Sequence, residues 1–398
     1  MESRFAQRMA RVQPSAIRDL LMLGADPTVT SFAGGYPDAS LFPMEHMKQA
    51  LQAAIAAMGG ESLQYTVSNG SARLRGQIAQ RMQDDGVVCG ADDVLVLQGS
   101  QQGLDLVAKL LVNEGDIVVT ESPTFIGALI AFNPCQPRYV GIPMDQDGMD
   151  MDALERSLKQ HRRIKLLYTV PDFQNPSGVT MSLVRRKRLI ELANEFDFCI
   201  LEDTPYRPLR FAGETIPTIK SMDAEGRVIL LGTFSKILAP GLRLGWVVAA
   251  PEIIEKLGLL KLAADTQCGT LTMAAVSSYL ETQDIAAHIV AIRSTYKRKK
   301  DVMLGAIRES FPKSVSCTNP DGGMFTWLSF PASFDTGRFM AEQALPKIKV
   351  AYVPGAGFFP VDEEANHARM SFPAHSDEVI VRGVTALGRL LRAELGDA

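Results

Sequence analysis

Short apolar runs alternate with amphipathic helical stretches over most of the chain. The apolar runs predict strands at 94–98, 116–120, 138–142, 165–169, 198–202 and 227–232. The helical stretches between them lie at 101–113, 150–160 and 182–196. Strands that alternate with helices are typical of a mostly parallel sheet with helices on both faces. The pattern therefore predicts an α/β fold.

The pattern changes toward the C-terminus. Residues 250–310 read as mostly helical, strands are expected at 322–330 and 349–353, and a closing helix at 376–395. We therefore expect a large domain over residues 45–290. A smaller α+β domain is expected from residues 291–398, with the N-terminal segment 1–44 joining it.

Composition narrows the function classes. The 398 residues are 46% hydrophobic and 22% charged, as in globular proteins. A net charge of −4 argues against sequence-independent nucleic-acid binding. No apolar run approaches the ~18 residues of a membrane span. The charged N-terminus does not resemble a signal peptide. Five scattered cysteines without a C-x-x-C pair indicate a reducing, cytoplasmic location. The five histidines form no metal motif.

The strongest chemical signal is Ser235-Lys236 in the run GTFSKILAPGLRLGW. The lysine follows a predicted strand within four residues, at the edge of an α/β sheet where ligands bind. Desolvation there lowers a lysine pKa and makes the amine nucleophilic. Arg243 could reach a phosphate if the chain folds back at Pro240. A bare Ser-Lys pair is more often a surface feature, but the whole run favours a functional site.

Two further strands end in side chains that suit an aromatic cofactor. Asp203, in ILEDTPYRPL, could pair with a protonated ring nitrogen, and Tyr206 could donate a phenolic hydrogen bond. Asn175, in VPDFQNPSG, could hydrogen-bond a phenolate oxygen. Each has an ordinary alternative, because Asp caps helices and Asn-Pro marks turns.

A phosphate site is suggested by LQGSQQGLD, where a strand ends and a helix opens. Backbone N–H groups and the helix dipole favour an anion at such a point, and Gly99 allows close approach. Ser100 and Gln101 add donors, although Ser is also an ordinary helix cap. The chain has no G-x-G-x-x-G or Walker pattern, so nicotinamide dinucleotides and ATP are poor candidates.

These four motifs, in this order along the chain, resemble the pyridoxal 5′-phosphate (PLP) enzymes of fold type I, and more narrowly the class I/II aminotransferases. The resemblance extends over nearly the whole chain. SFAGGYPDASLFP looks like the family's N-terminal segment, QYTVSNGSARLR like its dimer-crossing loop, and NHARMSFP like its substrate-binding C-terminal segment. The run SAIRDLLML shortly before SFAGG is most similar to the 2-aminoadipate subgroup, which includes broad-specificity aromatic and branched-chain enzymes.

The resemblance implies roles for the catalytic and ring-binding residues. Lys236 would form the Schiff base with PLP and shuttle the proton. Asp203 would keep the pyridine nitrogen protonated, so that the ring serves as an electron sink. Asn175 and Tyr206 would hydrogen-bond the ring hydroxyl, and Phe125 would stack on the ring.

The resemblance also implies phosphate and substrate contacts. The phosphate would be held by Ser100, Gln101, Ser235 and Arg243. Tyr65 would reach the phosphate of the neighbouring subunit, which implies a homodimer with a shared active site. Arg369 would bind the substrate α-carboxylate as a bidentate pair, near Asn175 and the backbone of Gly35. Arg18 matches the position that meets side-chain carboxylates.

The implied activity is transfer of an amino group from an L-amino acid with an acidic, aromatic or aliphatic side chain to a 2-oxo acid such as 2-oxoglutarate. One alternative is a PLP-dependent lyase, decarboxylase or racemase, because the lysine motif does not select the reaction. Another is a transcription regulator with an aminotransferase-like domain. That class carries a winged-helix region ahead of the PLP domain, for which the early start of the resemblance leaves no room. No nucleic-acid or membrane partner is expected.

Overall fold

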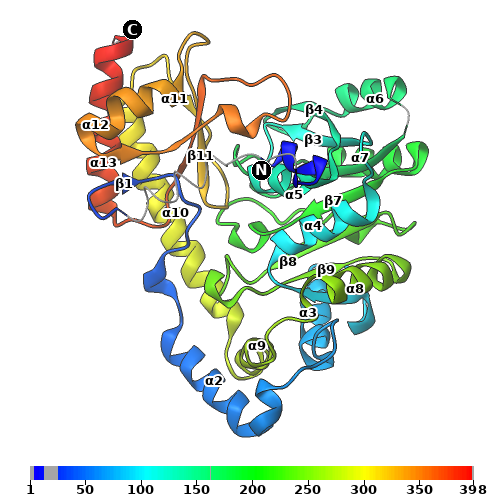
Figure 1. The fold of residues 1–398 in the computed structure, drawn as a ribbon. Coiled ribbons are helices and arrows are strands. Elements are labelled where there is room, and N and C mark those ends of the chain that lie inside the picture. The colour runs from blue at the N-terminus through cyan, green and yellow to red at the C-terminus, as the bar shows by residue number, and fades with distance from the viewer. Residues whose placement is uncertain (1–3, 13–25, 162, 397–398) are drawn as a thin grey trace.

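The computed structural model describes residues 4–12, 26–161 and 163–396. Its largest element is an eight-stranded sheet, flanked by helices (Figure 1). In spatial order its strands are β2 (Val94–Leu97), β9 (Gly245–Val248), β8 (Val228–Thr233), β7 (Cys199–Asp203), β6 (Ile164–Thr169), β3 (Ile117–Ser122), β4 (Arg138–Asp145) and β5 (Gly148–Met149). Six of these strands run in the same direction, and β9 and β5 run opposite to them. The expected α/β fold with a mostly parallel sheet is confirmed, and β9 is a strand that the sequence pattern did not assign.

Alternating side chains of this sheet enter two separate hydrophobic cores. Val118 faces the larger core and Val119 the smaller one, as the two-residue period of a strand requires. Helices α4 (Ser100–Leu111) and α5 (Ile126–Phe132) contribute to the larger core, and α6 (Met151–Gln160) and α7 (Leu183–Phe196) to the smaller. With both faces covered, the central strands β6, β7 and β8 are mostly apolar and almost wholly buried.

A second part of the molecule holds a four-stranded antiparallel sheet. Its order is β10 (Ser316–Cys317), β11 (Phe325–Ser329), β14 (His367–Ser371) and β13 (Val353–Pro354). Beside it β1 (Thr30–Ser31) pairs in parallel with β12 (Val350–Ala351). The strand expected at 349–353 is therefore split between two sheets. Tyr352 lies at the break, buried, and its hydroxyl donates to the Thr336 carbonyl at 2.7 Å.

Long helices connect these parts. Helix α10 (Ile285–Ser310) packs against the C-terminal α13 (Asp377–Leu395), beside β1 in Figure 1. The other helices among the described residues are α2 (Met44–Met58), α3 (Ala72–Asp84), α8 (Pro251–Asp265), α9 (Thr270–Thr282), α11 (Thr336–Phe339) and α12 (Leu345–Ile348), with a π-helical turn at Met340–Ala344. Short 3₁₀ turns lie at Gln7–Arg11, Ala39–Leu41, Gly59–Leu63, Ala91–Asp93, Asn133–Cys135, Arg207–Leu209, Lys220–Met222, Pro240–Leu242 and Ala356–Phe358. The domain boundaries at 44 and 290 stay predictions.

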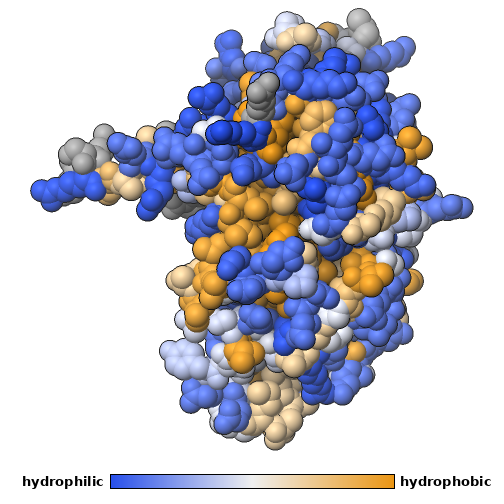
Figure 2. Space-filling view, turned by 90° about the vertical axis from the view of Figure 1, so that its right-hand side faces the viewer, coloured by the Kyte–Doolittle hydropathy of each residue, from blue (hydrophilic) through white to orange (hydrophobic). Residues whose placement is uncertain are grey.

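The surface mixes apolar and polar areas. On the face in Figure 2, hydrophobic residues gather in the middle and hydrophilic ones dominate around them. Within the described ranges, no helix has the length and apolar character needed to span a bilayer. Across the same residues, no three His, Cys, Asp or Glu side chains group so as to hold a metal ion.

Candidate active site

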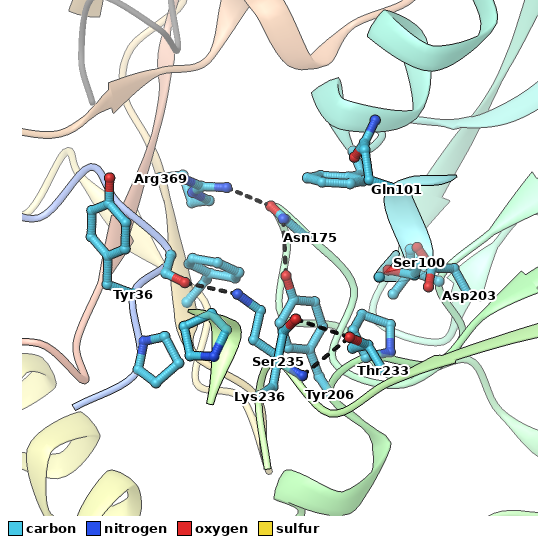
Figure 3. A pocket seen from close by; sticks show the side chains of 18 of the residues that line it. Tyr36, Ser100, Gln101, Asn175, Asp203, Tyr206, Thr233, Ser235, Lys236 and Arg369 are labelled. Atoms are coloured by element: carbon cyan, nitrogen blue, oxygen red, sulfur yellow. Dashed lines mark hydrogen bonds between the residues drawn. The ribbon is translucent and has the colours of Figure 1, made fainter. Parts of the chain in front are cut away.

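The carboxyl ends of β2, β3, β6, β7 and β8 meet at one edge of the large sheet, because these strands run in the same direction. A cavity of about 320 Å³ lies at this edge, closed on its other side by the N-terminal segment and by the small sheet. Ligands bind in such crevices of α/β folds. Figure 3 labels residues that line it, among them Asn175 after β6, Asp203 at the end of β7 and Lys236 after β8.

Lys236 follows β8 and directs its amine into the cavity. Nζ donates to the Gly35 carbonyl at 2.9 Å, which ties the end of β8 to the N-terminal segment (Figure 3). Burial lowers the pKa of Lys236 from its usual range to about 8, and the charges of Arg369 and Arg243 act in the same direction. A lowered pKa leaves part of the amine neutral near physiological pH, which suits it to nucleophilic attack and proton transfer.

Asp203, the last residue of β7, is buried with one carboxylate oxygen unused. Oδ2 accepts a hydrogen bond from the Tyr168 hydroxyl at 3.1 Å, whereas Oδ1 has no partner among the described residues. Burial raises the pKa of Asp203 to about 7, against the opposing effects of the Tyr168 hydrogen bond and the Lys236 charge. A buried acceptor without a partner is costly, so this oxygen is suited to a donor brought by a ligand.

Asn175, Tyr206 and Arg369 form a hydrogen-bonded chain along one wall (Figure 3). The Asn175 amide donates to the Tyr206 hydroxyl at 3.2 Å, and its oxygen accepts from Arg369 Nη1 at 2.8 Å. Arg369 Nη2 donates to the Ala33 carbonyl at 2.7 Å. Its Nε is buried without a partner in the described part of the chain, and burial lowers the guanidinium pKa to about 10. Arg369 thus offers free N–H groups to an anion inside the cavity.

The N-terminus of α4 presents groups suited to an anion. Gly99, with φ +79°, precedes the helix and supplies no side-chain cap. Arg243 lies beside it, since a Cβ at Gly99 would come within 2.8 Å of Arg243 Nη2. Ser235 lines the same cavity, and its Oγ and backbone N–H both contact Thr233 Oγ1. A helix dipole, uncapped N–H groups and a guanidinium together favour a phosphate.

A buried charge network holds two of the site loops together. The Asp172 carboxylate pairs with Arg186 at 2.9 Å, with Arg207 at 3.3 Å and with Arg210 at 3.4 Å. These contacts tie the loop that carries Asn175 to the turn that follows Tyr206. Separating one partner of a buried ion pair from the other leaves a buried charge uncompensated, which is costly. The network therefore keeps both loops in place.

The structure brings together all but two of the residues singled out from the sequence. The cavity is lined by Gly35, Ser100, Gln101, Phe125, Asn175, Asp203, Tyr206, Ser235, Lys236, Arg243 and Arg369. The Gln101 amide donates to the Gly127 carbonyl at 2.7 Å, beside Phe125. Tyr65 lies outside the cavity with 80% of its surface exposed, and Arg18 lies outside the described residues.

Other residues of the site were not singled out from the sequence. Tyr36, Thr233, Phe325 and Val353 also line the cavity. Tyr36 belongs to the SFAGGYPDASLFP segment, which could have indicated it. Phe325 carries no local signal, because it reaches the site only through the pairing of β11 with β14. Tyr168 likewise carries no local signal, because it lies within a mostly apolar strand.

Comparisons with known proteins agree with this geometry. Residues 32–387 match the family model described as aminotransferase class I and II. The chain is 41% identical to aromatic-amino-acid aminotransferase 1 of Thermococcus litoralis, over 99% of this chain and 95% of that protein. It is 38% identical to 2-aminoadipate transaminase of Thermus thermophilus, over 98% and 97%. The Pyrococcus horikoshii kynurenine aminotransferase, solved in complex with PMP, superposes with a TM-score of 0.94 at 39% identity, over 99% of this chain and 98% of that one.

Proposed function

The chain belongs to the class I and II aminotransferases, PLP-dependent enzymes of fold type I that transfer an amino group from amino acids to 2-oxo acids, and we propose that Lys236 is its Schiff-base lysine. We propose further that the amino donor is an L-amino acid with an aromatic, aliphatic or acidic side chain, and that the acceptor is a 2-oxo acid such as 2-oxoglutarate. The observation that carries the assignment is the unpartnered Asp203 Oδ1, which shares one cavity with Lys236 Nζ.

The donor set of the cavity fits PLP. Asp203 Oδ1 lacks a donor among the described residues, as a carboxylate would before it receives a ring N–H. The uncapped start of α4 with Ser100, Gln101, Ser235 and Arg243 suits the phosphate, and Phe125 offers a ring face. Asn175 and Tyr206 suit the ring hydroxyl. When bound, PLP supplies an electron sink that stabilises a carbanion at the substrate α-carbon.

The chain's own residues would do the rest. Arg369 would bind the substrate α-carboxylate through Nε and Nη2, which orients the α-carbon toward Lys236. Nζ of Lys236 would take the proton from the substrate α-carbon. It would then give that proton back in the next step, which completes the transfer of the amino group. A pKa near 8 suits this task, because the amine can both accept and release a proton near neutral pH. The ionised Asp203 would accept a hydrogen bond from the ring N–H⁺ and so keep the ring nitrogen protonated.

The described walls of the cavity favour an apolar substrate side chain. Phe325, Val353 and Pro37 line the cavity together with Arg369, and Tyr36 adds a half-exposed phenol at its rim. The Arg369 guanidinium carbon lies 4.2 Å from the centre of the Phe325 ring, so the carboxylate site adjoins an aromatic surface. We therefore propose aromatic and aliphatic amino acids as the better donors. The match of Arg18 to a carboxylate-binding position is what supports acidic donors.

The proposed activity is tested by the absorption spectrum of the PLP-loaded protein during single additions of L-amino acids, without any oxo acid. Conversion of the cofactor to its amine form with an equal amount of 2-oxo acid is expected. The donor with the fastest conversion identifies the substrate class. Release of carbon dioxide, ammonia or racemised amino acid instead would replace transamination with the lyase, decarboxylase or racemase alternative.

We propose that two copies share the active sites through the region around Tyr65. Leu63 and Tyr65 are about 80% exposed, and the neighbouring surface of α2 exposes Leu51, Ile55 and Met58. Exposed apolar side chains on adjoining segments are typical of an interface. Sedimentation velocity is expected to give a dimer. Tyr65→Phe is expected to weaken PLP binding while the protein remains a dimer. A monomeric protein with full activity would contradict the proposal.

We also propose a cytoplasmic location. All five cysteines lie within the described ranges, and each of them is free of a disulfide. Unpaired thiols in a chain of this length suit a reducing compartment. Fractionation of the native host cells, with the protein followed by antibody, tests the location.

A further inference from the structure

The Tyr168 hydroxyl contacts the carboxylate on which the proposed function depends. Tyr168 lies on β6, fully buried, and donates to Asp203 Oδ2 at 3.1 Å. The other oxygen, Oδ1, is left without a partner among the residues that the structure describes. We propose that Tyr168 is a positioning residue for Asp203, which fixes the carboxylate so that Oδ1 faces the pyridine nitrogen and which stabilises its ionised form. This inference rests on the proposed function.

The phenol is fixed in place and remains a donor. Its ring packs edge-on against Phe132, with centroids 5.7 Å apart and an interplanar angle of 80°. Burial, together with the charges of Asp203 and Glu121, raises the pKa of Tyr168 well above its usual value. The hydroxyl therefore keeps its proton over the working pH range. A hydrogen bond donated to a carboxylate favours its charged form.

The other groups around Asp203 in the described part of the chain do not donate a hydrogen bond to its carboxylate. Glu121 on β3 is a second buried carboxylate, and it takes its hydrogen bonds from Thr169, Val170 and Gln174. Burial above all, and the charge of Asp203, raise the pKa of Glu121 to about 7 against the effect of these hydrogen bonds. Glu121 gives no hydrogen bond to Asp203 and adds no positive charge that would stabilise its ionised form.

Two other groups face Asp203 from the cavity. Lys236 favours the ionised carboxylate through its charge, but its own pKa is about 8. The neutral Tyr206 hydroxyl is bonded to Asn175. Tyr168 therefore supplies the direct hydrogen bond that the structure gives this carboxylate.

The test uses binding rather than turnover. The probe is pyridoxine 5′-phosphate, which has the ring nitrogen and phosphate of PLP but no aldehyde, so that Lys236 cannot react with it. Its dissociation constant is measured against pH on the cofactor-free protein. Affinity should fall as pH drops through the pKa of Asp203, because the neutral carboxyl no longer attracts the ring N–H⁺.

Tyr168→Phe keeps the ring and removes the hydroxyl. We expect about tenfold weaker binding at neutral pH and a midpoint shifted up by roughly one pH unit, the scale of one charge-assisted hydrogen bond. Tyr139→Phe is the matched control. It also removes a hydroxyl, which donates to Asn133 Oδ1 at 2.8 Å, but Tyr139 does not line the cavity. Its affinity and midpoint should equal those of the unsubstituted protein.

A double-mutant cycle separates positioning from general loosening. In the Asp203→Asn background, Tyr168→Phe should change the affinity by less than about twofold, because its effect runs through the carboxylate. A full tenfold loss in that background would overturn the inference. If Tyr168→Phe does not fold, Tyr168→3-fluorotyrosine replaces it. Its more acidic phenol is a stronger donor, so the midpoint should move to lower pH, and an unmoved midpoint would count against the inference.

The outcomes separate the inference from the function beneath it. An unsubstituted protein that does not bind pyridoxine 5′-phosphate would refute the proposed cofactor site. Binding by the unsubstituted protein, with Tyr168→Phe indistinguishable from Tyr139→Phe, would refute only the role of Tyr168.

Discussion

Replacing Arg369 by lysine keeps a positive charge but removes the planar fork. Two of the guanidinium's five N–H groups are already used, on Asn175 and Ala33, and Nε is buried without a partner in the described ranges. A substrate carboxylate can therefore accept from Nε and from the second hydrogen of Nη2. Lysine offers a single ammonium, which cannot reproduce two parallel bonds.

The loss can be estimated from these contacts. One charge-assisted hydrogen bond contributes about 1.5–3 kcal/mol. The stacking of the guanidinium over Phe325, at 4.2 Å, adds about 0.5–1 kcal/mol. The sum of about 2–4 kcal/mol corresponds to a 30- to 1,000-fold lower kcat/KM. Burial lowers the pKa of Lys236 to about 8 in the same cavity, so a lysine at position 369 would also lose part of its charge.

The assay is the single-turnover half-reaction of Arg369→Lys with L-phenylalanine and, separately, with 2-phenylethylamine. The amine has the same side chain but no carboxylate, so only the amino acid should lose the predicted factor. PLP affinity serves as a control for the position of Asn175. A loss below about threefold for phenylalanine, or an equal loss for the amine, would refute the assignment of Arg369 to the α-carboxylate.

Three further predictions concern the lysine and the phosphate site. Lys236→Ala should still bind PLP, but borohydride should no longer attach it to the protein by mass spectrometry, and transamination should fall by about 10²–10⁴-fold or more; retained turnover would contradict the role. The rate at which the cofactor-free protein attaches PLP should rise about tenfold between pH 7 and pH 9 and then level off, because the neutral amine reacts and the pKa of Lys236 is about 8; a flat profile would contradict it. Gly245→Ala should destabilise the protein by about 1–3 kcal/mol and weaken PLP binding, because its Cβ would lie 2.8 Å from backbone atoms of Gly99 and Ser100. The matched Gly305→Ala, with open space around its Cβ, should not lower the melting temperature, and equal effects of the two would rule out the steric explanation.

The local pattern of apolar and polar residues determined much of the large sheet and of the site at its edge. The mostly apolar runs at 165–169, 198–202 and 227–232 correspond to strands, because strands buried on both faces of a parallel sheet are rich in apolar residues. The site motifs lie at or just after the ends of these runs, where side chains such as Asp203 and Lys236 reach the cavity. The order of the motifs therefore indicated one edge of one sheet, and Lys236, Asp203 and Asn175 do line one cavity there.

Tertiary structure decided what depends on pairing between distant segments. Strand β9 inserts antiparallel between β2 and β8, and the run expected at 349–353 is divided between two sheets, because each register is set by partners far along the chain. The same holds for the site. The contacts of Tyr168 with Asp203 and of Arg369 with Ala33 join residues 35 and 336 positions apart. Burial shifts the pKa values of Lys236 and Asp203 toward neutrality only once those partners have closed around them.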